Sequence, residues 1–525
     1  MSLTITPYDG VDVIGGNKIL VESQGRAVFL DFGTPYSIRN RFFEEYLSPR
    51  AGRGLLDPIV MGLIPPLWGI YRTDLEPPEA SIKPRMERMP GFRELALDGI
   101  ILSHAHLDHC GYLSFLRSDI PIYTGATTAV VAKAFQDSGK SSDFEQEVCY
   151  LTPRVEQEGL LTAANYRTQA ALGRPVYLVD EPALSPVEGP AIDQSLADFW
   201  ARSPATRGLN CQPLLPAHQV GGMALRRFPV DHSIPGASAF ALETAEGWVV
   251  YTGDLRWHGA QRHLTEAFVE QAARLYPLAL ICEGTNTGPE PPTSEEEVHS
   301  RCLEAVRAEP GLVIADFAAR NLERLLTFRD IACQTGRCLA ILGKDAYLLD
   351  AMRCLAPDVP DLAADKALCL YMDAKRAQLK WEKEVRQRYQ ARLVGPAEVC
   401  RSPGSYILAL SFFDIHELPD LNPDGGGSYI YSTSEAYSEE QKIDLERLRH
   451  WLEHFHMRFV GDYERGERGF HASGHMTGPD ILRLVRAIKP RFVIPVHTEK
   501  PEFFLDNLGS QFKVMLPTAG QPISW

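Results

Sequence analysis

Three histidines and one aspartate lie within six consecutive positions of this chain, at His104, His106, Asp108 and His109. They follow the apolar residues 99–102, which the pattern predicts to be a buried strand. Imidazole and carboxylate groups are preferred ligands of zinc and similar divalent ions. His104 and His106 are spaced to grip one ion, and Asp108 and His109 to reach a second. The alternative, ordinary surface or helix-capping side chains, is disfavoured because the spacing is so dense.

This His-x-His-x-Asp-His spacing resembles the signature of the metallo-β-lactamase superfamily. The resemblance implies three further ligands in order along the chain: a histidine, an aspartate that bridges two ions, and a last histidine. The candidates are His232 after one apolar strand, Asp254 at the end of another, and His497 at the end of a third. It also implies that Asp31, in Leu30-Asp31-Phe32-Gly33, orients the metal loop from behind. The alternative for Asp31 is a residue that simply ends a strand in a turn.

A second group of chemical residues lies near the end of the chain, in the turn Ser473-Gly474-His475. A predicted helix at 479–488 and a strand ending in His497 follow it, so two imidazoles are expected at neighbouring strand ends. Because the resemblance assigns His497 to the metal, His475 is left over. An unliganded imidazole beside a metal centre is suited to protonate a leaving oxygen. The alternative is a packing histidine.

Ser473-Gly474-His475, taken with the segments around His497, His232 and Asp254, resembles the β-CASP branch of the superfamily, and most of all the ribonuclease J family. That resemblance implies an α/β domain inserted between Asp254 and the Ser-Gly-His turn. It implies that Glu283 pairs with His475, and that a histidine at 497 marks a member acting on RNA. Three residues are candidates to bind substrate phosphate: Ser473, Gly474 and Ser233.

The predicted fold is α/β: an αββα metallo-β-lactamase sandwich with an inserted doubly wound α/β domain. The expected boundaries are 1–264 for the first part of the sandwich, 265–464 for the insert and 465–525 for the closing part. Insertions near 36–95 and 126–205 lengthen the first part. The former is loop-like and rich in Arg and Pro, either a lid or a solvated excursion, and the latter is predicted to be mostly helical.

Composition narrows the class of protein. The 525 residues are 45% hydrophobic and 23% charged, as in globular proteins, with no apolar run near the ~20 residues that cross a bilayer. Ten cysteines without regular spacing and an N-terminus without signal-peptide character predict a cytoplasmic protein. The net charge of −15 gives no general support for nucleic-acid binding. Residues 373–401 are locally basic, with eight Lys or Arg against four Asp or Glu, which is either a phosphate-contacting surface or a solvated helix face.

The resulting hypothesis is a metal-dependent ribonuclease, cleaving RNA by a hydroxide that two divalent ions activate. Zinc is the expected metal, with manganese and magnesium as alternatives. One ion would be held by His104, His106 and His232, the other by Asp108, His109 and His497, with Asp254 bridging, and the catalytic set would be His475, Glu283 and Asp108. RNA is the expected partner, with homo-oligomers possible and no membrane. Two alternatives stay open: a dimetal hydrolase of a small phosphodiester, ester or DNA, and a noncatalytic member of an RNA-processing complex.

Overall fold

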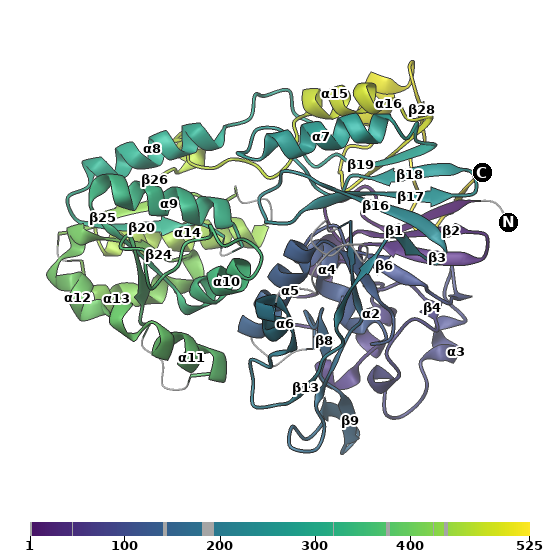
Figure 1. The fold of residues 1–525 in the computed structure, drawn as a ribbon, viewed down its shortest axis with the longest axis horizontal. Helices are drawn as coiled ribbons and strands as arrows, with labels where there is room; N and C mark the ends of the chain where they lie inside the picture. The colour runs from purple at the N-terminus through teal and green to yellow at the C-terminus, as the bar shows by residue number, and fades with distance from the viewer. Residues whose placement is uncertain are drawn as a thin grey trace.

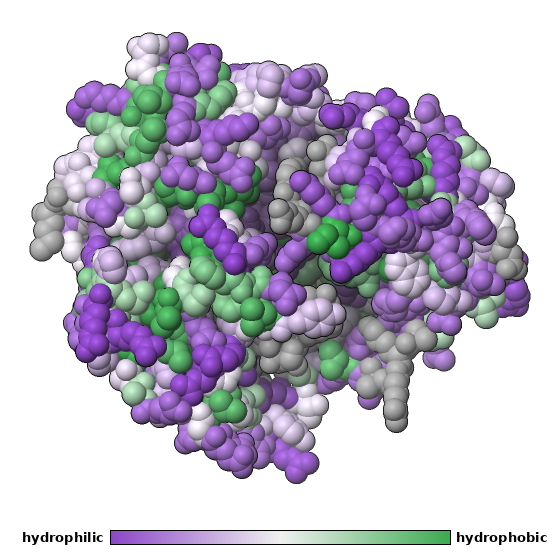
Figure 2. Space-filling model, turned by 180° about the vertical axis from the view of Figure 1, so that it is seen from behind, coloured by the Kyte–Doolittle hydropathy of each residue, from purple (hydrophilic) through white to green (hydrophobic). Residues whose placement is uncertain are grey.

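Two stacked sheets form a sandwich, and a third sheet forms a separate lobe beside it (Figure 1). The computed structural model describes residues 3–44, 46–139, 144–180, 194–318, 320–373, 378–423, 425–434 and 439–525. Seen from behind, the surface is hollowed between the sandwich and the lobe, and polar side chains cover most of the lobe (Figure 2). In these residues no helix combines the length and the apolar character needed to cross a membrane.

The first sheet of the sandwich has eight strands in the order β14-β12-β7-β6-β3-β2-β1-β29, so the last strand of the chain pairs with the first. Its inner strands are nearly continuous apolar runs, as expected for strands covered on both faces. The strands are β1 (Thr4–Asp9), β2 (Lys18–Ser23), β3 (Arg26–Leu30), β6 (Gly99–Ile101), β7 (Ile122–Thr124), β12 (Val176–Val179), β14 (Leu214–Ala217) and β29 (Ile523–Ser524).

The second sheet has seven strands in the order β15-β16-β17-β18-β19-β27-β28. β16, β17 and β18 form an antiparallel meander, and β19, β27 and β28 add to it in parallel. The strands are β15 (Gln219–Val220), β16 (Met223–Pro229), β17 (Ser238–Thr244), β18 (Gly247–Tyr251), β19 (Ala279–Glu283), β27 (Phe492–Val496) and β28 (Lys513–Val514).

A hydrophobic core between the two sheets holds the sandwich together, with Val21 and Ile101 of the first sheet packed among Phe240, Ile281 and Val496 of the second. A further core lies outside the second sheet, under α7 (Arg262–Ala273), α15 (Gly478–Ile488) and α16 (Glu502–Leu508). Helices α2 (Leu56–Val60), α4 (Leu107–Cys110) and α5 (Ala126–Ser138) lie on the other side (Figure 1). The predicted αββα layering is confirmed.

The lobe is built on an entirely parallel sheet with helices on both faces, so the predicted doubly wound fold is also confirmed. Its strands run in the order β23-β22-β21-β24-β20-β25-β26. They are β20 (Leu312–Asp316), β21 (Cys338–Ile341), β22 (Leu368–Tyr371), β23 (Leu393–Val394), β24 (Tyr406–Ala409), β25 (Gly427–Tyr431) and β26 (Met457–Val460). The helices are α8 (Glu295–Ala308), α9 (Leu322–Thr335), α10 (Gly343–Arg353), α11 (Lys380–Arg388), α12 (Pro396–Arg401), α13 (Leu418–Leu421) and α14 (Glu439–His454).

The predicted start of the insert, residue 265, lies before the parallel sheet of the lobe begins. α7 covers the second sheet of the sandwich, and β19 pairs with β18 and β27 within it. The strand alternation that begins near 278 therefore continues the sandwich before it builds the lobe, whose first described strand is β20. The division into domains otherwise remains a prediction.

The structure bears on one alternative for the first insertion and on the predicted helix content of the second. Residues 36–95 form short elements with a buried interior that includes Leu55, Ile59 and Leu75, so they are not a solvated excursion. The segment 126–205 has two helices but is otherwise built from short strands, so the prediction of a mostly helical segment was wrong for its described part. The additional elements are α1 (Tyr36–Phe42), β4 (Leu67–Trp68), α3 (Lys83–Met86), β5 (Arg93–Glu94), β8 (Tyr150–Leu151), β9 (Arg154–Gln157), β10 (Leu160–Ala163), β11 (Ala171–Gly173), α6 (Gln194–Ala201) and β13 (Leu209–Asn210).

Candidate metal centre

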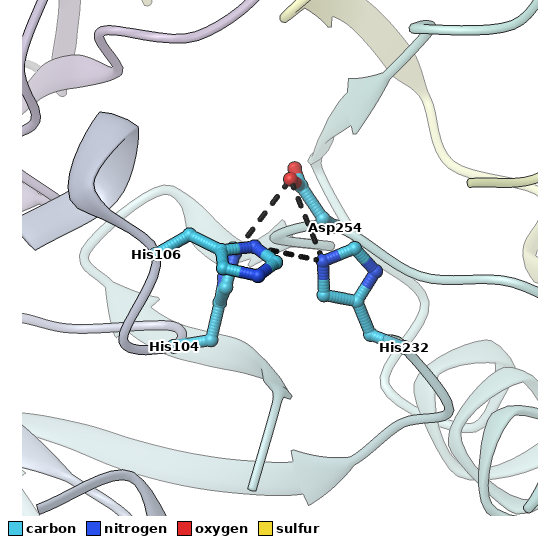
Figure 3. Close-up of side chains that lie close together, drawn as sticks. All are labelled: His104, His106, His232 and Asp254. Carbon is cyan, nitrogen blue, oxygen red and sulfur yellow. Dashed lines mark hydrogen bonds and ion pairs between the residues drawn. The ribbon is translucent and has the colours of Figure 1, made fainter. Parts of the chain in front are cut away.

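The predicted ligands meet at one end of the sandwich, although they come from four separate segments of the chain. His104 and His106 lie in the loop after β6, and Asp108 and His109 on α4. The loops after β16, β18 and β27 supply the other three, His232, Asp254 and His497. Figure 3 shows four of these side chains pointing toward one another. The structure thus brings all seven together.

One group of ligand atoms is formed by three imidazoles and a carboxylate. His106 Nδ1 lies 3.1 Å from His104 Nε2 and 3.2 Å from His232 Nε2. Asp254 Oδ2 lies 3.7 Å from His104 Nε2 and 4.0 Å from His232 Nε2. Tetrahedral zinc with bonds of about 2.0–2.1 Å separates its ligand atoms by about 3.3 Å. The spacing in this group therefore suits one divalent ion.

The second group shares Asp254 with the first. Asp254 Oδ2 lies 3.1 Å from His109 Nε2 and 3.7 Å from His497 Nε2. Asp108 Oδ2 lies 3.3 Å from His497 Nε2 and 3.7 Å from His109 Nε2. Because one carboxylate oxygen faces both groups, Asp254 occupies the position that a bridging ligand would need.

Two buried atoms of the cluster lack any hydrogen bond to the described residues: His109 Nε2 and Asp254 Oδ1. A buried polar atom without a partner costs about 1–3 kcal/mol, so such atoms are rare in folded proteins unless a ligand satisfies them. A divalent cation between the two groups would satisfy both. The donor set and these orphaned atoms fit a divalent metal.

The protonation states of most of these groups also favour metal binding, which requires neutral imidazoles and charged carboxylates. Burial lowers the pKa of His106 to about 4 and that of His104 well below its ordinary value. Burial alone would raise the pKa of Asp108 and Asp254, but facing imidazoles, His109 and His497, hold both below their ordinary range. His109 is the exception, because neighbouring carboxylates raise its pKa against the effect of burial. A bound cation would take the place of its proton.

Asp31 holds the loop of the predicted ligands from behind, as the resemblance implies. Its Oδ1 accepts the backbone N–H of Ser103 at 2.7 Å. Its Oδ2 accepts hydrogen bonds from the Ser103 and Tyr251 hydroxyls, both at 2.7 Å, and lies 2.7 Å from His109 Nδ1. A proton on Nδ1 of His109 therefore faces Asp31 and leaves Nε2 for the metal, as is usual for metal-binding histidines.

Gly33, two residues after Asp31, lets the chain pass directly under the metal loop. A Cβ atom at this position would lie 1.7 Å from the backbone oxygen of Asp108 and 2.6 Å from the backbone nitrogen of His109. Both neighbours are backbone atoms, so no side-chain rotation can relieve the clash. The glycine of Leu30-Asp31-Phe32-Gly33 is thus required by the position of Asp108 and His109, two predicted metal ligands.

Other imidazoles are held in the same way by residues that sequence reasoning missed. Thr285 Oγ1 lies 2.8 Å from His497 Nδ1, and Ser103 Oγ lies 2.9 Å from His104 Nδ1. The nearness of Ser103 to His104 in the chain was a usable signal, whereas Thr285 lies 212 positions from its partner. His218, which precedes β16 in the chain, is exposed and lies apart from the cluster.

His475 lies at the rim of the cluster and is held by a buried carboxylate. Its Nδ1 is 3.0 Å from Glu283 Oε2 and 3.2 Å from Oε1, and Glu283 also accepts hydrogen bonds from Leu255 N and the Thr285 hydroxyl. The centroid of the His475 ring is 5.2 Å from that of the His232 ring. Burial lowers the pKa of His475, but the adjacent Glu283 charge outweighs it and raises the pKa to about 9, an effect that bound cations would oppose. The predicted pairing is therefore seen.

The candidate phosphate-binding residues pack closely against His232, a predicted metal ligand. His232 Nδ1 lies 2.5 Å from the carbonyl oxygen of Gly474. A Cβ atom on Gly474 would lie 2.7 Å from Ser233 Oγ and 2.8 Å from His232 Cε1, so only glycine fits there. Ser473 Oγ accepts the backbone N–H of His475 at 3.1 Å. The three candidates, Ser473, Gly474 and Ser233, thus adjoin the metal cluster, and their contact with phosphate stays a prediction.

Comparisons with known proteins agree with this geometry. Residues 468–503, which contain the Ser-Gly-His turn and His497, match the family RMMBL, described as a Zn-dependent metallo-hydrolase RNA specificity domain. Ribonuclease J of Mycolicibacterium smegmatis is 25% identical over 294 residues, covering 53% of this chain and 47% of that protein. Ribonuclease J2 of Bacillus subtilis is 23% identical over 281 residues, covering 52% and 46%. The chain thus spans about half the length of the curated relatives it matches.

A crystal structure of a protein of unknown function from Enterococcus faecalis V583 matches the whole fold, with a TM-score of 0.65, 21% identity and 100% of each chain covered. The αββα sandwich and its inserted parallel sheet match the predicted fold, a metallo-β-lactamase sandwich with a β-CASP insert. Several ribonuclease J proteins are among the relatives that this chain matches, so the resemblance stated from the motifs is confirmed.

Proposed function

We propose that this protein is a metal-dependent ribonuclease that hydrolyses RNA phosphodiester bonds at a site for two divalent ions. One observation carries the proposal: His475, held by buried Glu283, lies beside two groups of ligand atoms that share Asp254. Phosphodiester hydrolysis needs charge neutralisation at the phosphate and a proton for the leaving oxygen, and this arrangement offers both.

The predicted ligands would form two groups, one for each ion. His104, His106 and His232 would hold one ion, Asp108, His109 and His497 the other, and Asp254 would contact both. Bound there, divalent ions supply positive charge for the phosphate and lower the pKa of water at the site. We expect zinc because the donors are imidazole nitrogens and carboxylate oxygens, with manganese or magnesium as alternatives.

His475 would donate the proton that the departing ribose oxygen requires. Its Nδ1 faces Glu283, so the proton to be transferred is on Nε2. Glu283 raises the proton affinity of the ring and fixes its orientation. Ser473, Gly474 and Ser233 would bind phosphate oxygens.

RNA is the substrate that the comparisons support, through the RNA specificity domain and the ribonuclease J relatives. The net charge of −15 still favours the alternative of a small phosphodiester to some degree, because it offers no general attraction for a polyanion. The third possibility, a noncatalytic member of an RNA-processing complex, is disfavoured because all seven predicted ligands lie together.

The test compares substrates on metal-loaded protein: a 5′-labelled single-stranded RNA, the DNA of the same sequence, and bis(p-nitrophenyl) phosphate. We expect RNA-selective cleavage that is lost in His475→Ala and in Asp108→Ala and kept in His218→Ala, which changes an exposed histidine. Hydrolysis of the small diester without cleavage of RNA would replace the proposal by a small-molecule hydrolase. No hydrolysis of any substrate by protein with bound metal would favour the noncatalytic alternative.

A further inference from the structure

A buried ionic network lies behind the Ser-Gly-His turn and is centred on Arg256, Glu295 and Arg324, with Glu323 of α9 as a further partner of Arg256. Both arginine side chains are fully buried. Arg256 Nη1 donates to Glu295 Oε1 at 2.9 Å, and Arg324 Nη2 donates to Glu295 Oε2 at 2.7 Å. One carboxylate therefore joins two guanidinium groups that are 68 positions apart in the chain.

The network crosses from the sandwich to the lobe. Arg256 follows the bridging candidate Asp254 by two residues, and its Nε donates to Asp231 Oδ1 at 3.0 Å, next to His232. Glu295 begins α8 and Arg324 lies on α9, both of which pack on the sheet of the lobe. A shift of the lobe would therefore act directly on the segments that carry two metal ligands.

The same two arginines hold the backbone of the turn that carries His475. The carbonyl oxygen of Ser473 accepts from Arg256 Nη1 at 3.3 Å and lies 2.9 Å from His258 Nε2. The carbonyl oxygen of Phe470 accepts from Arg324 Nη1 at 3.2 Å and from the Ser432 hydroxyl at 2.6 Å. Two carbonyls on the approach to His475 are thus fixed by one connected set of side chains.

Stability alone is a weak explanation for such a network. Removing charges from water costs several kcal/mol per ion, and replacing a buried ion pair by apolar side chains is often neutral or stabilising. Apolar side chains in their place could not donate hydrogen bonds to the carbonyl oxygens of Ser473 and Phe470. The geometry of the turn is the property that depends on these charges.

We propose that Glu295 is a positioning residue for the general acid His475. By fixing Arg256 and Arg324 together, it sets where the 470–475 turn places the imidazole relative to the metal cluster. The lobe then takes part in catalysis by placing the acid, in addition to shaping the substrate path. This inference rests on the proposed ribonuclease function.

The test uses two substrates that differ in their need for an acid. The ribose oxygen of RNA must be protonated as it leaves, whereas p-nitrophenolate leaves bis(p-nitrophenyl) phosphate without a proton. For Glu295→Gln we expect kcat on RNA to fall about 10- to 100-fold, the size expected when a group is misplaced by about 1 Å. KM for RNA, bound metal and hydrolysis of the small diester should stay within about 3-fold.

The matched control is Asp137→Asn, in an equally buried contact between the sandwich and the lobe. Asp137 Oδ2 lies 2.6 Å from Lys133 Nζ and accepts from the Tyr347 hydroxyl at 2.7 Å, joining α5 to α10. This contact includes none of the residues that hold the turn. We expect Asp137→Asn to lower stability and to leave the rates on both substrates within about 3-fold.

If Glu295→Gln does not fold, His258→Leu replaces it, because His258 contacts the same Ser473 carbonyl from the sandwich side. We expect a smaller loss on RNA, about 3- to 10-fold, again without loss on the small diester. Parallel losses on both substrates, or unchanged RNA cleavage in the folded variants, would overturn the inference. A wild-type protein that cleaves no RNA would instead reject the proposed function.

Discussion

A buried aspartate lies at the end of a strand in both the sandwich and the lobe, but the pKa values of the two are shifted in opposite directions. Asp254 follows β18 in the sandwich, and Asp316 ends β20 in the lobe. Burial raises the pKa of both. At Asp254 facing imidazoles more than reverse that effect and hold the pKa well below its ordinary value. At Asp316 the main opposing contact is the Tyr429 hydroxyl, at 2.6 Å, and its pKa rises to about 7.

The difference shows that the place in the topology does not decide the chemistry. Ligands of open α/β sheets often bind at the carboxyl ends of the strands, and the lobe has a cavity of about 350 Å³ there. That cavity is lined by Asp316, Asp345, Phe317, Phe412 and Phe413 among others, a setting that favours neutral carboxyl groups. At the sandwich, imidazoles instead hold the pKa values of Asp108 and Asp254 low, and only there do the described side chains suit a divalent cation.

The largest expected effect separates these two aspartates. Asp254→Asn should reduce RNA cleavage more than about 100-fold and lower the bound metal, since even the outer partners of metal ligands contribute 10- to 100-fold. Asp316→Asn keeps an oxygen that can accept the Tyr429 hydroxyl and should stay within about 3-fold of wild type. Initial rates and elemental analysis of both variants provide the measurement. Equal losses in the two would contradict the assignment of the site to the sandwich.

Two glycines, one beside the candidate metal centre and one in the lobe, extend the comparison of sandwich and lobe to backbone packing. Gly33→Ala should lower metal affinity and RNA cleavage about 10- to 100-fold, because the added methyl would push the backbone at Asp108 and His109. Gly343→Ala, at the start of α10 in the lobe, adds a methyl whose nearest atom is in Trp381, 3.6 Å away, and should be tolerated. Metal binding by calorimetry tests both. Normal affinity in Gly33→Ala would show that the metal loop does not need this close approach.

The smallest effect concerns the dependence of stability on pH. Burial raises the pKa of Asp316 and Asp345 to about 7, from an ordinary 3.8. The folded protein therefore binds these protons more tightly than the unfolded chain does. The stability that this contributes is fully present below about pH 4 and is lost as pH rises through about 7.

At pH 8, Asp316→Asn should consequently be more stable than wild type by on the order of 4 kcal/mol, with little difference at pH 4. Thermal unfolding of both proteins between these values measures the change. A stability difference that stays constant with pH would mean that Asp316 is charged in the folded protein.

The sequence alone indicates the candidate site because four of its predicted ligands lie close together in the chain. The dense spacing of His104, His106, Asp108 and His109 needs no knowledge of the fold, and the resemblance supplied the order of His232, Asp254 and His497. The buried arginines and Glu295 were missed because their partners are far away in the chain: the Arg256 contact to Ser473 spans 217 positions. No periodicity marks such a contact.

The fold was predicted where its elements are long. Strands of six or seven residues such as β2 and β16 show their pattern clearly. Between 126 and 205 the strands have only two to four residues, too few for a period of two to stand out, and they were taken for helix. The boundary at 265 was too early because β19 resembles the strands of the lobe in composition while it pairs with those of the sandwich.

The most direct test of the central claim is a metal titration of chelator-treated protein, followed by cleavage of single-stranded RNA. If the cluster is a two-ion ribonuclease site, cleavage should be absent at first and should reach a plateau at about two equivalents of zinc or manganese per chain. Tight binding of two equivalents with no RNA cleavage at any loading would contradict the account.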